Sequence, residues 1–236
     1  MPAFFRALEK NNDRAWFGER KALFEQEVRG PMVALVTMLN ERMRKLSADH
    51  SADEPERLIY RIYRDTRFSK DKTPYKVHLG ATFRHRTLPR HAGAGFYFEV
   101  SHKYVGIAGG VYMPGPEELK AIRDAIAKDA KGFLTIVEHR QRRKMFGALQ
   151  GQKLTRLPKP LQEHAASPAA EYLKHKQFYW WVELPAQTAL KKDLPTVLLR
   201  HFEAMADGLA WFNRVLLAAR REEEDDPSAL RPKPMW

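Results

Sequence analysis

Apolar residues recur at two different spacings along this chain, and the two spacings predict two kinds of element. In residues 31–46, and again from Leu194 to about Arg221, apolar side chains return every three or four positions, as on one face of a helix. In Lys76–Arg84 they alternate with polar residues, which is typical of a strand with one buried face. The pattern therefore places strands in the middle of the chain and helices on both sides of them.

The middle of the chain predicts a largely antiparallel sheet with one polar face. The breaks between alternating segments are short, and the break at His102-Lys103 favours a hairpin. Lys76, His78 and Arg84 fall on the polar side of their strand, and Glu99 falls on the polar side of the next one. Strands are expected at Leu58–Arg64, Lys76–Arg84, Gly95–Ser101, Tyr104–Tyr112 and Gln177–Leu184.

The flanking segments predict helices before and after the sheet. Gly30-Pro31 is expected to end one helix, and proline suits the first turn of the next because its missing N–H has no partner there. Because helices precede and follow the strands without alternating with them, we expect an α+β fold, with N-terminal helices and a long C-terminal helix packed on the sheet. Helices are expected at about 4–8, 13–28, 31–46, 116–129, 131–144, 169–175 and 194–221, within a single domain of residues 1–221. Residues 222–236 form a charged tail that is expected to be flexible.

The composition narrows the classes of function. The chain has 236 residues, of which 44% are hydrophobic, so it can bury a substantial core. It has no cysteine, which excludes disulfides, zinc–thiolate sites, iron–sulfur clusters and cysteine nucleophiles. No run approaches the roughly 18 apolar residues of a membrane-spanning helix, and the first residues lack the order of a signal peptide. We therefore expect no membrane insertion and a cytoplasmic location.

The basic charge of the chain is concentrated in two segments. The whole sequence carries 41 Lys and Arg against 29 Asp and Glu, a net charge of +12. Residues 57–91 contribute +8 and residues 131–144 contribute +4, so the remainder is neutral. A local excess of this kind favours an anionic partner such as a phosphorylated small molecule or a nucleic acid.

The segment Arg64–Lys76 holds five cations, two carboxylates, three hydroxyls and a phenol. Arginine grips phosphate or carboxylate with two hydrogen bonds and lysine supplies a point charge, so the composition predicts an anion site. A plain polar loop is the alternative, with Asp65 paired to Arg67 and Asp71 to Lys70; such exposed pairs contribute only about 0–1 kcal/mol. The anion-binding candidates are Arg64, Arg67, Ser69, Lys70, Lys72, Tyr75 and Lys76, with Asp71 orienting the cations.

The same segment resembles the signature of an uncharacterised family called domain of unknown function 2461. Further matches occur at Asn11–Phe17, Gly95–Tyr97, Gly109–Pro114, Leu119–Arg123 and Leu173–Phe178. The resemblance covers roughly residues 3–220, so it implies one domain throughout, and it implies no mechanism. Within the matched motifs, Gly109, Gly110 and Arg123 are candidates for supporting the anion site, whereas Glu99 departs from the family pattern.

Familiar catalytic motifs are missing from the sequence. It contains no GxxxxGK[ST] phosphate loop, no GxGxxG that opens a helix after a strand, no HExxH and no GxSxG. Histidines and carboxylates show no metal-ligand spacing, so no metal is predicted, and the sequence identifies no cofactor. Asp65, His78 and Glu99 remain as candidates for acid–base chemistry if the strands bring them together. Whether the protein is an enzyme stays open.

Three functions fit these observations. The first is a site for a small anionic or phosphorylated ligand centred on Arg64–Lys76. The second is a nucleic-acid-binding module, in which both basic clusters contact phosphates and Tyr60, Tyr63 and Tyr97 stack on bases. The third is a protein-interaction domain for an acidic partner. The sequence specifies neither the ligand nor the oligomeric state.

Overall fold

The structure is a computed structural model that describes residues 1–52, 54–89 and 92–224. The described chain divides into two compact units. Unit 1 comprises Met1–Arg86, Gly95–Gly109 and Trp181–Ala206, and unit 2 comprises Thr87–Ala94, Gly110–Trp180 and the residues from Asp207 onward. Each unit is considered separately below.

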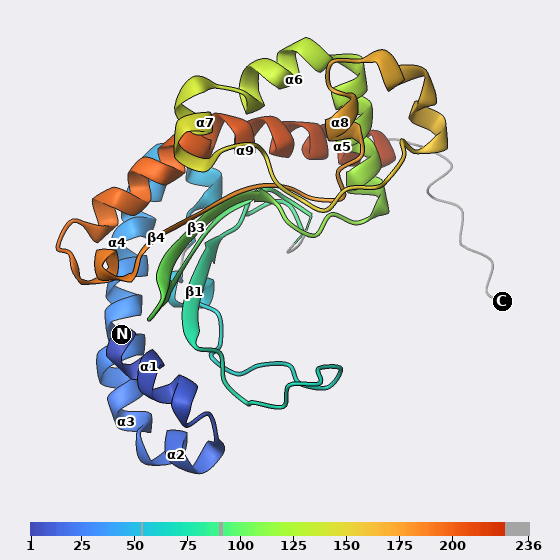
Figure 1. The fold of residues 1–236 in the computed structure, drawn as a ribbon. Coiled ribbons are helices and arrows are strands. Elements are labelled where there is room, and N and C mark those ends of the chain that lie inside the picture. Colours follow the sequence, from blue (N-terminus) through green and yellow to red (C-terminus); the bar gives the residue numbers. More distant parts are fainter. Residues whose placement is uncertain (53, 90–91, 225–236) are drawn as a thin grey trace. The chain divides into compact units, whose positions relative to one another are not determined.

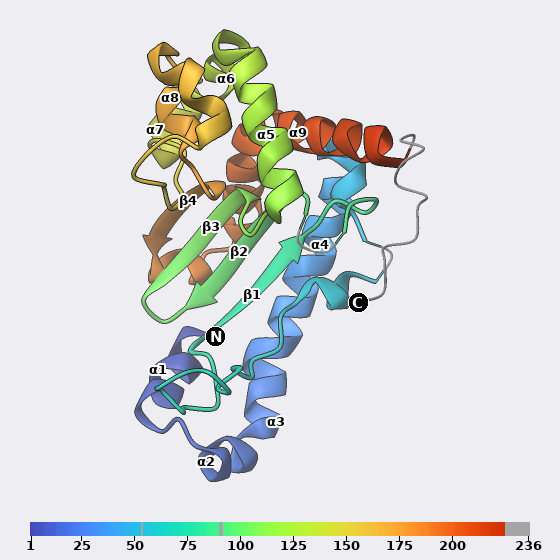
Figure 2. The same ribbon diagram turned by 90° about the vertical axis from the view of Figure 1, so that its right-hand side faces the viewer.

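The strands form the antiparallel sheet that the alternating pattern predicts. Its order is β1-β2-β3-β4, and β1 pairs with β2 so that His78 lies opposite Ser101 and Phe83 opposite Phe96. Figure 2 shows β1, β2 and β3 side by side. The strands are β1 (His78–Phe83), β2 (Gly95–Ser101), β3 (Tyr104–Val111) and β4 (Phe178–Pro185). The predicted α+β fold is confirmed.

Among the described residues, the predicted strand at 58–64 makes two isolated bridges, one with β1 and one with the chain that leads into it. Ile59 pairs with Ala81 and Tyr63 pairs with Tyr75, both antiparallel. Three residues lie between the bridges in the segment 59–63, but five lie between them in the segment 75–81. The longer segment therefore bulges, and a continuous ladder of hydrogen bonds cannot form. Lys76 lies in this bulged segment, two residues before β1 begins.

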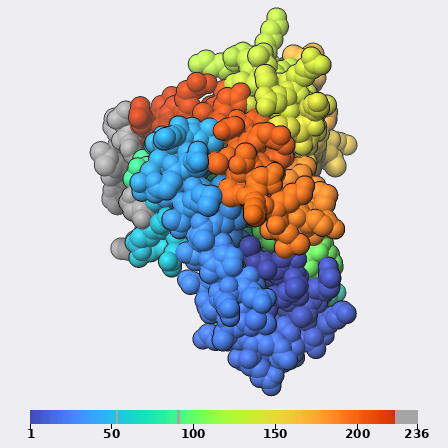
Figure 3. Space-filling model, turned by 90° about the vertical axis from the view of Figure 1, so that its left-hand side faces the viewer, coloured from blue at the N-terminus to red at the C-terminus, as the bar shows by residue number. Residues whose placement is uncertain are grey.

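The N-terminal helices are connected differently from the prediction. A break was expected at Gly30-Pro31, but Gly30 has helical dihedral angles, and the chain runs from α3 through a π-helical segment, Glu25–Arg29, into α4. The wider π turn accommodates a proline that cannot donate a backbone hydrogen bond. Unit 1 contains α1 (Pro2–Lys10), α2 (Arg14–Glu19), α3 (Lys21–Phe24) and α4 (Gly30–Leu46), which form the blue surface in Figure 3.

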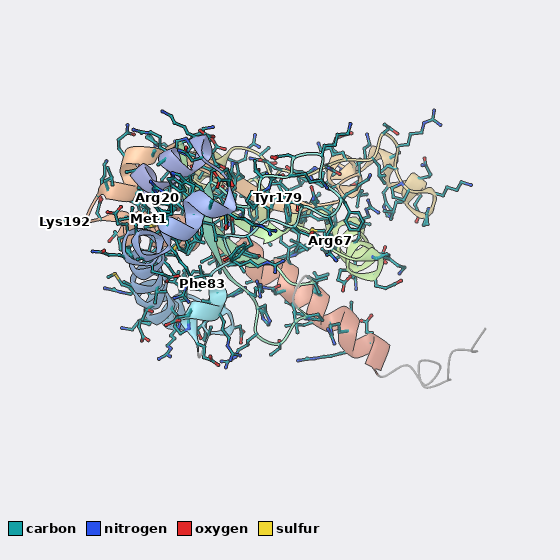
Figure 4. The ribbon with its side chains drawn as sticks, turned by 90° about the horizontal axis from the view of Figure 1, so that it is seen from below. Met1, Arg20, Arg67, Phe83, Tyr179 and Lys192 are labelled. Carbon is teal, nitrogen blue, oxygen red and sulfur yellow. The ribbon has the colours of Figure 1, made fainter. Side chains whose placement is uncertain are left out.

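The apolar face of β1 and β2 supplies part of the core of unit 1. Phe83 and Phe96 are fully buried, and their ring centroids lie 5.9 and 5.1 Å from that of Phe202 on α9 (Leu194–Glu224). Phe83 is labelled in Figure 4. Because successive residues of a strand point to opposite faces, this burial leaves the even-numbered residues of β1 on the other, polar face.

Unit 2 contains short helices and the end of the long one. The helix predicted at 131–144 is two helices, and Arg142 in the second is buried and donates to the carbonyl of Ile136 near the end of the first. The predicted tail begins inside α9, which extends to Glu224, and residues 225–236 lie outside the described chain. The helices are α5 (Pro116–Lys128), α6 (Ala130–Val137), α7 (Arg140–Phe146) and α8 (Ala170–Leu173). Among the described residues, no helix has the length and apolar character that crossing a bilayer requires.

Candidate anion-binding site

The loop 65–74 extends from unit 1 on the side of β1 opposite to α4 (Figure 1). Its two limbs are joined near the base by Arg64, whose guanidinium donates to the carboxylate of Asp71 and to the hydroxyl of Thr73. Asp71 also accepts the Thr73 amide at 3.0 Å. These bonds hold the pKa of Asp71 at about 2.

The second arginine of the loop is paired in the same way. Arg67, labelled in Figure 4, donates from Nε and Nη2 to the two carboxylate oxygens of Asp65 at 3.0 and 2.8 Å. These bonds, with that from the Arg67 amide, hold the pKa of Asp65 at about 2. The pair Asp65–Arg67 is the one expected for a plain polar loop, whereas Asp71 contacts Arg64 in place of the expected Lys70. Both arginines are therefore occupied by carboxylates of the loop itself.

The other candidates in this segment have different surroundings. Lys72 donates to the carbonyl of Thr66 at 2.9 Å, and Lys70 is exposed, with no ion pair in the described part of the chain. Ser69 is half-buried in the turn where its amide donates to Thr66. Tyr75 is buried and stacked on Phe17, with ring centroids 4.1 Å apart, so its position is explained by packing.

A second group of cations gathers on the polar face of β1. Lys76 precedes the strand and Arg84 follows it, yet the Nζ of Lys76 and the guanidinium carbon of Arg84 lie 5.4 and 5.6 Å from the centre of the Tyr60 ring. Tyr60 is held there by its amide, which donates to the carbonyl of Gly80 at 2.8 Å. The ring in turn lies 6.0 Å from the ring of Tyr97 on β2.

These cations lack the carboxylate partners that the loop arginines have. Within the described ranges, neither Lys76, Arg84 nor the neighbouring Arg61 makes an ion pair. Burial lowers the pKa of Lys76 and the positive charge of Arg61 lowers it further, while the carboxylate of Glu99 acts in the opposite direction. An ammonium group in this position is stabilised by any anion that approaches it.

A buried carboxylate lies beside these cations. Glu99 on β2 is 6% exposed, and its two oxygens accept hydrogen bonds from the hydroxyls of Tyr97 and, at 2.7 Å, Tyr104. Burial and the adjacent carboxylate raise the pKa of both phenols, so they remain donors near neutral pH. The Nε2 of His78 lies 3.5 Å from the same carboxylate. The structure thus brings His78 and Glu99 together, while Asp65 faces Arg67.

His78 lies beside this carboxylate and is partly open to solvent. Its side chain is 31% exposed, so solvent or a ligand can reach it. Burial lowers the pKa of His78, and the carboxylate of Glu99 acts in the opposite direction. A neutral imidazole whose protonated form is stabilised by a neighbouring carboxylate has the arrangement of a general base.

Two glycines leave room for the aromatic side chains of this face. A Cβ atom at Gly80 would lie 2.5 Å from the hydroxyl of Tyr97, and one at Gly106 would overlap the ring of Trp181. Trp181 also contacts Tyr104, with ring centroids 6.1 Å apart. The sheet surface around Glu99 is therefore covered by aromatic rings that lie where glycines provide space.

The proposed supporting residues make contacts that explain them without a ligand. Gly109 is buried, and Gly110 has a φ of 135° and lies against the backbone of Phe178, where a side chain would overlap it. Arg123 donates to the carbonyl of His175 at 2.8 Å, and burial lowers its pKa. The backbone of unit 2 thus accounts for Gly110. Arg123 bonds that backbone through Nη2, while its buried Nε has no hydrogen-bond partner among the described residues.

The second basic cluster is partly neutralised within unit 2. Arg142 is 1% exposed, is paired with Asp207 and lies 4.7 Å from the centre of the Trp180 ring. Arg143 pairs with Glu138 at 3.1 Å. Two of the five cations in this cluster therefore belong to intramolecular contacts. In the described part of the chain, no group of three or more histidines and carboxylates is arranged to hold a metal ion.

Three members of the sheet face were named from the sequence, but they were not assigned to the anion site. Tyr60, Tyr97 and Arg84 contact one another or Lys76, but only the alternation of β1 and β2 signals that they share a face. The high density of cations in 64–76 favoured the loop as the anion site. A sequence shows which residues are charged but not which of them form ion pairs.

Comparison with known proteins places the chain in a family. A family model described as conserved hypothetical protein, DUF2461, matches residues 1–211. This range contains the loop 65–74 and the strands that carry the polar face, and it confirms the resemblance read from the motifs. No curated protein and no solved structure gives a significant match. Because the family model spans most of its length, the chain belongs to the DUF2461 family of conserved hypothetical proteins.

Proposed function

We propose that this protein binds a small anionic ligand, with a phosphate or carboxylate group, on the polar face of β1. One observation carries the proposal. Lys76 and Arg84 approach the same Tyr60 ring from the two ends of the strand, and neither has an ion pair among the described residues. The nearby carboxylate of Glu99 offsets part of the repulsion between these like charges, but it is hydrogen-bonded to two phenols and makes no ion pair with either cation, so a bound anion would lower the free energy further.

The neighbouring groups suit such a ligand. Lys76 provides a point charge and Arg84 a planar fork of donors, which together can hold the oxygens of a phosphate or a carboxylate. His78 lies on the same face, half-exposed, and is oriented toward Glu99. A ligand held by the two cations is therefore placed beside a group that can accept a proton.

The experiment is a titration of the protein with inorganic phosphate at low ionic strength, with binding measured by calorimetry. A sugar phosphate, a nucleoside monophosphate and a dicarboxylate serve as further arms that separate phosphate from carboxylate recognition. Lys76→Gln removes one charge from the proposed site, and Lys70→Gln removes one from the exposed loop as a matched control. Loss of one charge-assisted contact is expected to weaken binding about tenfold in Lys76→Gln. Lys70→Gln is expected to change phosphate affinity less than about threefold, because Lys70 acts on the site only through long-range charge.

Two results contradict the proposal. One is a wild-type protein that binds none of the four anions. The other is a Lys76→Gln variant that binds phosphate as tightly as the Lys70→Gln variant.

A further inference from the structure

The tip of the loop 65–74 presents an aromatic ring to solvent. Phe68 is 95% exposed, the highest value among the exposed large hydrophobic residues of the described chain. The guanidinium of Arg67 lies over it, 5.7 Å from the ring centre. Tyr63, at the base of the same loop, is 51% exposed. Exposing rings in this way costs solvation free energy that packing inside the protein would recover.

The loop is held in one conformation by its own contacts. Arg64 joins the limbs at the base, and Lys72 donates across the loop to the carbonyl of Thr66 at 2.9 Å. The same carbonyl accepts the amide of Ser69, so Phe68 lies inside a closed turn. A ring fixed in place loses less conformational entropy on binding than one on a disordered segment.

The charge left on the loop is positive. Asp65 and Asp71 are matched by Arg67 and Arg64, so the charges of Lys70 and Lys72 remain. We propose that this loop forms a second site, separate from the sheet face, which binds single-stranded nucleic acid by stacking a base on Phe68 while Lys70 and Lys72 contact phosphates. Every base has a planar face, so such a contact requires no particular sequence.

Other anionic macromolecules fit this loop less well. A duplex is read by a helix or a two-stranded ribbon that fills a groove, and a turn with one ring provides neither. A lipid surface is bound stably through a larger apolar area than one phenyl ring supplies. An acidic protein partner would bury Phe68 as an apolar group, without regard to its flat face.

The test is fluorescence anisotropy with a labelled oligodeoxythymidine of about ten nucleotides, a length within single-strand site sizes. Phe68→Ala is expected to weaken binding about tenfold, and Phe68→Trp to retain it. Phe68→Leu keeps the apolar volume and removes the ring, so it should lose binding as Phe68→Ala does. Lys70→Gln/Lys72→Gln should reduce the slope of log K against log salt by roughly 1.4, since each phosphate contact adds about 0.7.

The proposal is overturned by a wild-type protein that does not bind the oligonucleotide at low salt. It is also overturned if Phe68→Leu binds as wild type does, since the contact is then apolar packing. Binding to anionic vesicles without binding to the oligonucleotide would also overturn the proposal. Phe68→Ala changes no charge and lies outside the sheet face, so it should leave phosphate affinity unchanged while it weakens oligonucleotide binding. The two proposals can therefore fail separately.

Discussion

The loop 65–74 and the polar face of β1 are neighbouring parts of the sequence with opposite electrostatic organisation. In the loop, Arg64 and Arg67 each hold a carboxylate only a few residues away. On the sheet face, Lys76 and Arg84 converge on Tyr60, and the buried carboxylate beside them is bonded to two phenols. A dense run of cations therefore indicates where charge is abundant, and pairing decides where charge is available to a ligand.

Burial separates the two regions further. The side chain of Asp65 is 47% exposed and that of Glu99 is 8% exposed. A solvated ion pair contributes about 0–1 kcal/mol, because water screens it and two long side chains must be ordered. Buried hydrogen-bonded groups cost more to disrupt, because the partner that is left behind cannot reach water. The comparison thus predicts different responses to equivalent substitutions.

The largest expected effect is on the sheet face. Glu99→Ala leaves the hydroxyls of Tyr97 and Tyr104 without their acceptor and should lower the free energy of unfolding by about 2–4 kcal/mol. Asp65→Ala, the matched change in the loop, should lower it far less, because water screens the exposed pair that it breaks. Urea unfolding of both variants measures the difference. Equal losses would remove the distinction between the two regions.

A smaller destabilisation is expected from Gly80→Ala. The added methyl group would lie 2.5 Å from the Tyr97 hydroxyl, so the ring must move and its bond to Glu99 is strained. Overpacking of this kind costs about 1–3 kcal/mol. Gly18→Ala is the control, because no atom lies within 4 Å of the position where its Cβ would be. Thermal unfolding should show a lower midpoint for Gly80→Ala alone.

The two regions should also respond to acid in different pH ranges. His78 has a lowered pKa in the folded protein, so the unfolded chain binds its proton more readily. The stability associated with neutral His78 is present above its ordinary pKa of about 6.5 and is lost as pH falls through the folded value. Asp65 and Asp71, with pKa values of about 2 against 3.8, lose their contribution only below pH 3.8.

His78→Asn tests this assignment. The variant should lose less stability than wild type between pH 7 and pH 5, measured as the shift in the urea midpoint. Asp65→Asn should follow the wild-type curve over that range. A His78→Asn curve parallel to that of wild type would show that His78 does not govern stability there.

The smallest effect is expected in the loop. Asp71→Asn removes the ion pair with Arg64 but leaves the core intact, so the free energy of unfolding should hardly change. The two limbs should separate more often, and trypsin should then cleave faster after Arg67, Lys70 or Lys72. Unchanged cleavage kinetics would mean that the pair does not hold the loop closed.

Much of the fold could be predicted because it follows from local periodicity. The alternation in Lys76–Arg84 correctly placed Lys76, His78 and Arg84 on one face, and it made the approach of His78 to Glu99 a conditional hypothesis. Their separation of 3.5 Å depends on the register between β1 and β2, which alternation alone does not specify. That a single domain spans the chain stays a prediction.

Other features depend on contacts that no local pattern reveals. Asp71 pairs with Arg64, seven positions away, because the loop folds back on itself. Arg142 lies in a run of basic residues that predicts a solvated surface, yet it is buried against Trp180 and paired with Asp207. The sequence therefore could not predict which cations of the candidate site form ion pairs and which do not.

The most direct test compares two double variants that lose the same charge from the two regions. Lys76→Gln/Arg84→Gln removes the unpaired cations of the sheet face, and Arg64→Gln/Arg67→Gln removes the paired cations of the loop. Phosphate affinity is measured by calorimetry at low ionic strength, after circular dichroism has verified that both variants are folded. We predict that the first variant weakens binding about a hundredfold, from two lost charge-assisted contacts, and the second less than about threefold. The opposite order would place the anion site in the loop and contradict this account.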